Sequence, residues 1–103
     1  MKNGYYKSSD GHQGWRVNGR LHREDGPAAI APDGTKEWYQ NDKLHREDGP
    51  AYIGANGTQE WWVNGKNITN EVNQWFEECN LTYDTMEFED KMALKFYIRG
   101  LST

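Results

Sequence analysis

Up to residue 68, hydrophobic residues occur in short runs separated by turn-forming pairs. Runs such as KEWYQ (36–40) and AYI (51–53) are rich in aromatic and β-branched residues, which favours short strands. Asn18-Gly19, Asn41-Asp42 and Asn64-Gly65 tolerate the positive φ angles that two-residue hairpin turns require. A second set of turns is indicated at 32–34 (PDG) and 55–57 (ANG). The pattern therefore predicts a meander of short antiparallel strands.

The hydrophobic pattern changes at Thr69 from strand-like runs to a helical period. Val72, Trp75, Phe76 and Cys79 form one helical stripe, with Thr69 or Asn70 as N-cap and Asn80 near the end. Cys79 on this stripe is expected to be a small buried hydrophobe. The sequence thus predicts a first amphipathic helix directly after the strands.

A second helix is predicted to begin near residues 84–87, where DTME resembles a capping box, and to end near Gly100. We expect it to cover the last strand together with the first helix, since terminal units of an array need protection. If a remainder stays exposed, it is expected to be a partner surface or a homo-oligomer contact. Its broad apolar face, expected to be buried on two sides, consists of Phe88, Met92, Leu94, Phe96 and Ile98.

The strand region contains an internal repeat. Residues 15–37 (WRVNGRLHREDGPAAIAPDGTKE) and 38–60 (WYQNDKLHREDGPAYIGANGTQE) are identical at 14 of 23 positions. A third unit opens as WWVNGK (61–66), and SSDGHQG (8–14) has the place of a closing half. A fixed period in the twenties is the sequence mark of a solenoid-like array.

The motif Trp-x-x-Asn-Gly-Lys, followed by a polar turn and x-x-x-Gly-Thr-x-x-Trp, resembles the MORN-type repeat, and most closely the NGKLHREDGPA variant of small bacteriophage and bacterial proteins. The resemblance covers residues 8–66. The expected fold is α+β: an antiparallel β-meander of MORN-like hairpin repeats with a 23-residue period, capped by two C-terminal α-helices. Residues 1–68 would form the repeat region and residues 69–103 the two-helix cap of the same domain. The resemblance implies a scaffold that binds other proteins.

Composition narrows the function classes. The chain has 103 residues, enough for one domain, and a mean hydropathy of −1.09. Residues 1–68 carry nine basic and nine acidic side chains, whereas residues 69–103 carry three and seven, which accounts for the net charge of −4. No basic cluster indicates nucleic-acid binding. A single cysteine and no apolar leader or 18-residue apolar run predict an intracellular protein without a membrane segment.

The octapeptide LHREDGPA occurs at 21–28 and again at 44–51, and has a structural and a functional interpretation. As a corner between strands, its Asp would accept hydrogen bonds from the following backbone N–H groups, its Gly would permit an unusual conformation, and its Arg and Glu would form ladders between units. His would bind the backbone or the Asp of the next unit. As a site, it would bind a small ligand through His22, Arg23, His45 and Arg46, or a metal through His22, Asp25, His45 and Asp48. We favour the structural interpretation, because an active site needs to be built only once.

Positions that differ between units are free to meet a partner. Alternation along the strands places the repeated tryptophans Trp15, Trp38 and Trp61 on one face, where they and the matching Ile30 and Ile53 are expected to form a thin core. The opposite face, called the variable face below, would show Arg16, Tyr39, Tyr52 and Trp62. These residue types are enriched in binding hot spots. The alternative is that the protein's own C-terminal segment covers this face.

The function expected from the sequence is that of a non-enzymatic binding module. There is no phosphate-binding loop, dinucleotide fingerprint or zinc-protease motif, and no cofactor is predicted. The resemblance implies a phage- or bacterium-encoded inhibitor or accessory factor, anti-defence or antitoxin-like, in the cytoplasm of a bacterial host. Its partner would be a host or bacterial protein, with no nucleic acid or membrane involved. The alternatives are a nucleotide or metal binder that uses the His, Arg and Asp corners, and a structural or oligomerising protein.

Overall fold

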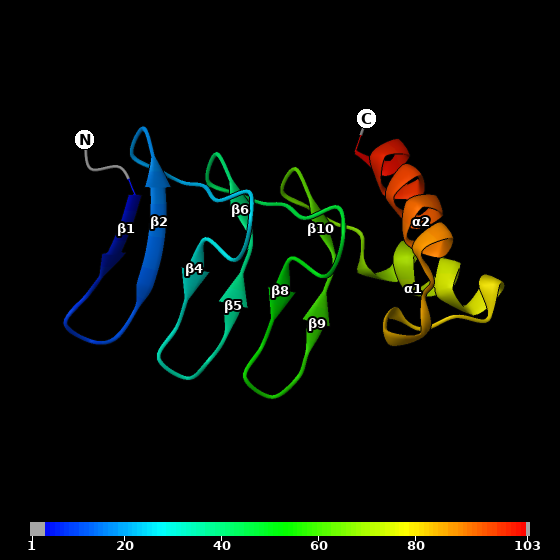
Figure 1. Ribbon diagram of the computed structural model, residues 1–103, viewed down its shortest axis with the longest axis horizontal. Coiled ribbons are helices and arrows are strands. Elements are labelled where there is room, and N and C mark those ends of the chain that lie inside the picture. Colours follow the sequence, from blue (N-terminus) through cyan, green and yellow to red (C-terminus); the bar gives the residue numbers. More distant parts are fainter. Residues whose placement is uncertain (1–3, 103) are drawn as a thin grey trace.

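The computed structural model describes residues 4–102 and shows an elongated molecule of 44 × 29 × 22 Å. Hairpins follow one another in a row, and the helices stand at its C-terminal end (Figure 1). The strands are β1 (Gly4–Lys7), β2 (Gln13–Val17), β3 (Arg20–Leu21), β4 (Ala29–Ile30), β5 (Lys36–Glu37), β6 (Tyr39–Gln40), β7 (Lys43–Leu44), β8 (Tyr52–Ile53), β9 (Gln59–Glu60), β10 (Trp62–Val63) and β11 (Lys66–Asn67).

All strand pairs described are antiparallel. The main sheet has the order β1-β2-β4-β5-β8-β9 with β3 paired to β2, and β6-β7 and β10-β11 form separate hairpins. The predicted antiparallel meander followed by two C-terminal helices is confirmed.

The predicted turns have the backbone angles that they require. Asn18, Asn41 and Asn64 have φ of 53°, 52° and 50°, and the residues that follow them are also positive. Asparagine tolerates this region because its short polar side chain bonds locally. In the second set of turns, the Thr35 N–H donates to Asp33 Oδ1 (2.9 Å), and its counterpart Thr58 donates to Asn56 (3.0 Å).

Two α-helices and one turn of 3₁₀-helix follow the strands. Helix α1 (Thr69–Cys79) ends at Asn80, as predicted, and Asn80 has the left-handed conformation (φ 53°). The expected N-cap at Thr69 or Asn70 is wrong, because both residues are already helical and Ile68 precedes the helix. A 3₁₀ turn, η1 (Tyr83–Thr85), occupies the place where the second helix was expected to begin. Helix α2 (Phe88–Leu101) therefore starts later, and its capping box joins Glu87 to Asp90, whose Oδ2 accepts the Glu87 N–H at 3.0 Å. Gly100 lies inside α2 and does not end it.

The hydrophobic core cluster lies where the third Asn-turn hairpin, β10-β11, meets the helices, not along the repeats. Its members are Trp61, Val63, Ile68, Val72, Met86, Leu94 and Ile98. The prediction that the repeated Trp and Ile residues form a thin core is wrong. Four of these residues are only partly buried, namely Trp15, Trp38, Ile30 and Ile53. Trp61 alone of the three tryptophans is buried, because the rings of Phe76 and Tyr83 pack edge-on against it with centroids at 5.9 and 5.7 Å.

Two expectations about the helix faces are also wrong. Cys79 is exposed, because α1 buries only Val72 fully and turns the end of its stripe toward solvent. The apolar face of α2 is buried on one side only, through Leu94 and Ile98. The remaining side, Phe88, Met92 and Phe96, is 76%, 40% and 67% exposed.

The helices stand beyond β10 at the end of the row (Figure 1), and the core shows that they pack around Trp61 and Val63. The variable faces of the earlier repeats therefore do not lie under the C-terminal segment. None of the helices within residues 4–102 combines the length and the apolar character needed to cross a membrane.

Candidate functional site

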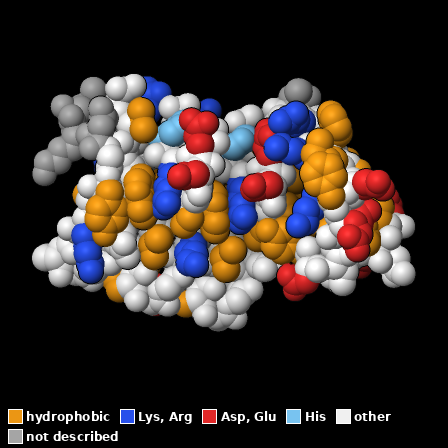
Figure 2. Space-filling view, viewed as in Figure 1, with side chains coloured by type: hydrophobic (Ala, Val, Ile, Leu, Met, Phe, Trp, Pro, Cys, Tyr) orange, Lys and Arg blue, Asp and Glu red, His pale blue; other side chains and the backbone are white. Residues whose placement is uncertain are grey.

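Each copy of the octapeptide forms a corner around an arginine stacked on a tryptophan. The Arg23 guanidinium carbon lies 4.0 Å from the ring centroid of Trp15, and the corresponding distance from Arg46 to Trp38 is 4.1 Å. A cation over an indole face is held by the ring quadrupole as well as by contact. Figure 2 shows basic side chains alternating with hydrophobic ones across this side of the molecule.

The same guanidinium groups fasten their own corner. Arg46 Nε donates to Asp48 Oδ1 (2.8 Å) and Nη1 donates to the Pro50 carbonyl (3.0 Å). In the first corner, Arg23 makes the same bonds to Asp25 (2.9 Å) and Pro27 (3.2 Å). The hydrogen bond from Arg23 lowers the pKa of the Asp25 carboxyl below its usual value.

These contacts correct the expected role of the charged residues. Instead of an Arg–Glu ladder between units, each arginine binds the aspartate two residues later in its own unit. That aspartate accepts from a guanidinium instead of capping the following backbone. The guanidinium is the stronger partner because it is itself charged, whereas a backbone N–H is neutral.

The glycine of the octapeptide makes room for the arginine. A Cβ on Gly49 would lie 2.5 Å from the Arg46 guanidinium carbon, and a Cβ on Gly26 would lie 2.9 Å from that of Arg23. Neither glycine has a positive φ, so the conformational role expected from the sequence is not the reason for them.

The histidines tie each corner to the next unit, as one of the sequence expectations stated. The Asn41 N–H donates to His22 Nδ1 (3.1 Å), and the Asn64 N–H donates to His45 Nδ1 (2.9 Å). Because Nδ1 accepts, the proton of a neutral ring is on Nε2. His45 Nε2 lies 3.8 Å from Glu47 Oε2, and His22 Nε2 lies 3.3 Å from Glu24 Oε2.

The protein should lose stability in mild acid through His45. Burial lowers the pKa of His45 below its usual value, against a smaller opposing effect of Glu47. The unfolded chain therefore takes up this proton first, and the stabilisation present above about pH 6.5 is lost as the pH falls through the lower folded-state pKa. Between about pH 7.5 and 5.5, Tm should decrease less for His45→Asn than for the wild type. Asparagine is chosen because its amide oxygen can replace Nδ1 as the acceptor. An equal decrease in both proteins would contradict this assignment.

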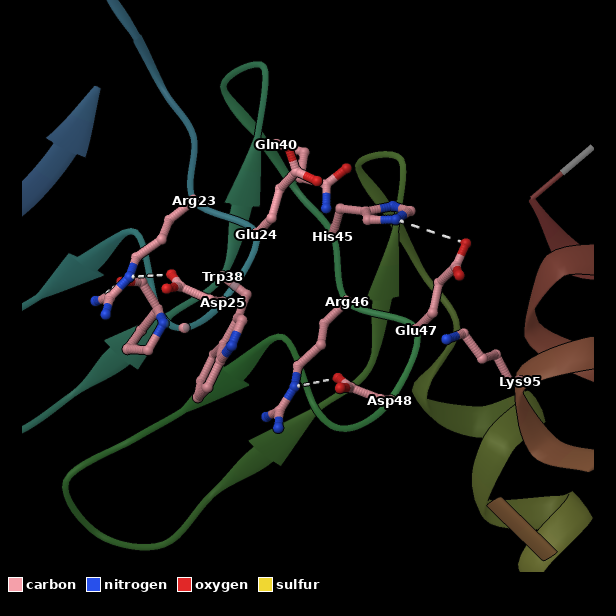
Figure 3. Close-up of a pocket in the computed structure, with 12 residues that line it drawn as sticks. Arg23, Glu24, Asp25, Trp38, Gln40, His45, Arg46, Glu47, Asp48 and Lys95 are labelled. Carbon is pink, nitrogen blue, oxygen red and sulfur yellow. Dashed lines mark hydrogen bonds and ion pairs between the residues drawn. The ribbon is translucent and has the colours of Figure 1, made fainter. Parts of the chain in front are cut away.

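A groove lies between the two corners and reaches α2 (Figure 3), with a volume of about 550 Å³. Three of the four alternative ligand residues, Arg23, His45 and Arg46, line it, whereas His22 is not among the lining residues. Lys95 of α2 also lines it. Both arginines already bind a carboxylate and a carbonyl, so the groove offers a ligand few unused charges.

The corner side chains proposed as metal ligands have other partners in the structure. Residues 4–102 contain no group of three or more His, Cys, Asp or Glu that could hold an ion. The carboxylates of Asp25 and Asp48 are engaged by arginine, and both histidine Nδ1 atoms accept a backbone N–H.

Strand register brings Tyr39, Tyr52 and Trp62 to one face of the row. Tyr52 lies directly opposite both Glu37 and Glu60 in the neighbouring strands. Because side chains alternate along a strand, Glu37 lies on the same face as Tyr39, and Glu60 on the same face as Trp62. Tyr39 Oη donates to Glu37 Oε2 (3.1 Å), and Trp62 Nε1 donates to Glu60 Oε1 (3.0 Å).

Each of the two carboxylates is thus a fixed acceptor for an aromatic side chain. Burial, assisted by the negative charge of Glu37, raises the pKa of Tyr39 to about 12. The phenol therefore stays protonated and keeps its hydrogen bond at neutral pH. The sequence did not lead us to name Glu37 and Glu60 as site residues, although both repeat units end in glutamate.

Arg16 lies at the N-terminal end of the variable face. Its Nη1 donates to the Gly19 carbonyl (3.0 Å), and its guanidinium carbon lies 5.4 Å from the ring centroid of Tyr6. Tyr6 pairs with Gly14 across β1 and β2, and a Cβ on Gly14 would be 2.5 Å from the Tyr6 ring. Gly14 stands where the later units have glutamate, so Tyr6 fills the space there and joins the variable face.

Comparison of the chain with protein-family models, with curated proteins and with solved structures gives no match. Within the repeats, the corner groove and the variable face are the two surfaces that bear on function.

Proposed function

We propose that this protein is a non-enzymatic protein-binding module of MORN-like repeats, and that the variable face is its contact surface. Support for a 23-residue repeat comes from contacts that recur at that spacing. The Arg–Trp stack, the His–Asn bond between units and the aromatic–Glu bond each occur twice, 23 residues apart.

The observation that carries the proposal is the fixed arrangement of the variable face. Tyr39, Tyr52 and Trp62 share one face with glutamates that hold two of them in place. Tyr and Trp give large contact areas, and side chains held before binding lose little entropy when a partner docks. The helices do not cover the part of the row that carries Tyr39 and Tyr52.

The charged corners are better explained as structure than as catalysis. Each corner's arginine, aspartate and histidine has an internal partner, as the bonds of Arg46, Asp48 and His45 show. A general acid or base needs a free proton site within reach of substrate. We therefore propose that the protein acts by occupying a protein surface in a bacterial cytoplasm, as an inhibitor or accessory factor of the anti-defence or antitoxin type.

A small-ligand binder is the second candidate, favoured by the groove of about 550 Å³ between the corners. It predicts that Lys95, which projects from α2 toward this groove, contributes to binding (Figure 3). The occupant would be an anion able to stack on Trp38, such as a nucleotide. A rise in Tm with a nucleotide, lost in Lys95→Ala, would favour this candidate over the first.

The variable face can be tested with one double variant and one matched control. Tyr39→Ala/Trp62→Ala removes two aromatic rings from the variable face, and Tyr5→Ala removes an exposed ring that packs against Trp15 on the opposite face. A protein captured from a bacterial lysate by the wild type should bind the double variant about 30-fold or more weakly in a purified titration. It should bind Tyr5→Ala as it binds the wild type.

The outcomes separate clearly if circular dichroism shows that all three proteins are folded. Equal binding to the wild type and the double variant would contradict the assignment of the variable face. Equal losses in the double variant and in Tyr5→Ala would do the same, because they would indicate a general effect on the array.

A further inference from the structure

Helix α2 presents a stripe of apolar side chains to solvent. Phe88, Met92 and Phe96 are four residues apart, so they follow one face of the helix, and both phenylalanines are more than two-thirds exposed. Figure 2 shows hydrophobic side chains gathered on the surface over α2. The helix is anchored by its other side, where Leu94 and Ile98 are buried. A single exposed apolar residue is ordinary, but a helical stripe of three is typical of a contact surface.

The charges on α2 are separated along its length. Glu89 and Asp90 lie in the first turn, and Lys91, Lys95 and Arg99 follow in the remainder. With two acidic and three basic side chains, α2 is nearly neutral, whereas α1 has three acidic side chains and no basic one. The local charge of α2 therefore does not oppose contact between two α2 helices. Two copies laid antiparallel would bring each acidic end beside a basic end.

We propose that α2 pairs antiparallel with α2 of a second copy of this chain, about a twofold axis at Met92. In this register residue 92 + k faces residue 92 − k of the second copy, so Phe88 packs against the other Phe96 and Met92 against its equivalent. A twofold contact of this kind uses the same surface on both chains.

The register also matches two charges. Glu89 lies at the same height along the pair as Lys95 of the second copy, so opposite charges share each end of the contact. Within residues 4–102 neither Glu89 nor Lys95 has an ion pair, whereas Arg99 binds Glu47 at 3.1 Å in its own chain. A parallel pair would instead place Glu89 beside Glu89 and the like-charged basic ends together, which is unfavourable.

The first test is the association state of the full chain. Sedimentation at about 0.1 mM should show dimers of the wild type, and Phe88→Ser/Phe96→Ser should raise the dissociation constant at least about tenfold. The variant should keep the circular dichroism spectrum of the wild type, because both side chains are exposed. A wild type that is monomeric at this concentration would overturn the proposal, as would dimers that form equally well without both phenylalanines.

The second test fixes the register by cross-linking. In a Cys79→Ser background, Met92→Cys should form a covalent dimer on mild oxidation, since the two sulfurs meet at the axis. Phe88→Cys is the matched control, because its two copies would lie about 12 Å apart along the helices, too far for a disulfide. Cross-linking of Phe88→Cys as efficiently as Met92→Cys would indicate a parallel or undefined pair and overturn the proposal. No cross-linking of Met92→Cys at a concentration where dimers are present would also overturn it.

Discussion

Replacement of Ile98 by alanine is expected to lower the free energy of unfolding by about 2–5 kcal/mol, because it removes a fully buried side chain from the hydrophobic core cluster. Ile98 packs in one cluster with residues of the third hairpin and of α1, including Val63 and Val72. A cavity at this point weakens the contact between the helices and the strands. Alanine favours the helical backbone, so the loss would come from packing alone.

Ile53→Ala is the matched control, because the same atoms are removed from a repeat. Ile53 is only partly buried, so its loss should be about 1 kcal/mol, well below that of Ile98. Urea unfolding of both variants measures the two values directly. A loss for Ile53→Ala equal to or larger than that for Ile98→Ala would place the main core in the repeats and contradict the structure.

Local patterns were enough to predict the strands, the turns and the presence of two helices, although α2 begins and ends later than the pattern indicated. Asn18, Asn41 and Asn64 adopt positive φ because a two-residue hairpin requires it, and this requirement is visible in the dipeptide itself. The stripe beginning at Val72 identified α1 because the helical period is also local. These predictions needed no knowledge of which segments touch.

The core could not be predicted in the same way, because it depends on distant neighbours. Trp15, Trp38 and Trp61 have similar sequence surroundings, yet only Trp61 is buried. The difference is made by Phe76 and Tyr83, which cover Trp61 in place of a stacked arginine. Nothing within one repeat specifies that replacement.

The variable face was partly accessible from the sequence. Alternation along each strand separates Tyr39 and Trp62 from the tryptophan before them, which requires only the strand period. The bonds to Glu37 and Glu60 were missed, although partners two residues apart on a strand share a face. The opposition of Tyr52 to both glutamates needs the strand register, which turns and spacing alone do not give.

The glycine of the octapeptide gives the second large effect. Gly49→Ala should lower the free energy of unfolding by about 1–3 kcal/mol, because the new Cβ would displace the Arg46 guanidinium from Trp38 and from its two acceptors. Arg46→Ala should cost a similar amount for the same reason. The two losses should not add, since both variants remove the same contacts.

In the Arg46→Ala background, the sign of the change in unfolding free energy caused by Gly49→Ala decides between two explanations of why residue 49 is glycine. The three atoms nearest to the added Cβ all belong to Arg46, and Gly49 does not have a positive φ. Once Arg46 is shortened, alanine should therefore be neutral or stabilise by up to about 1 kcal/mol, because it restricts the unfolded chain. Urea unfolding of the two single variants and the double variant measures this directly. If Gly49 were needed for backbone conformation, alanine would destabilise the protein in both backgrounds by the same amount, and the role of glycine as space for the stacked arginine would be wrong.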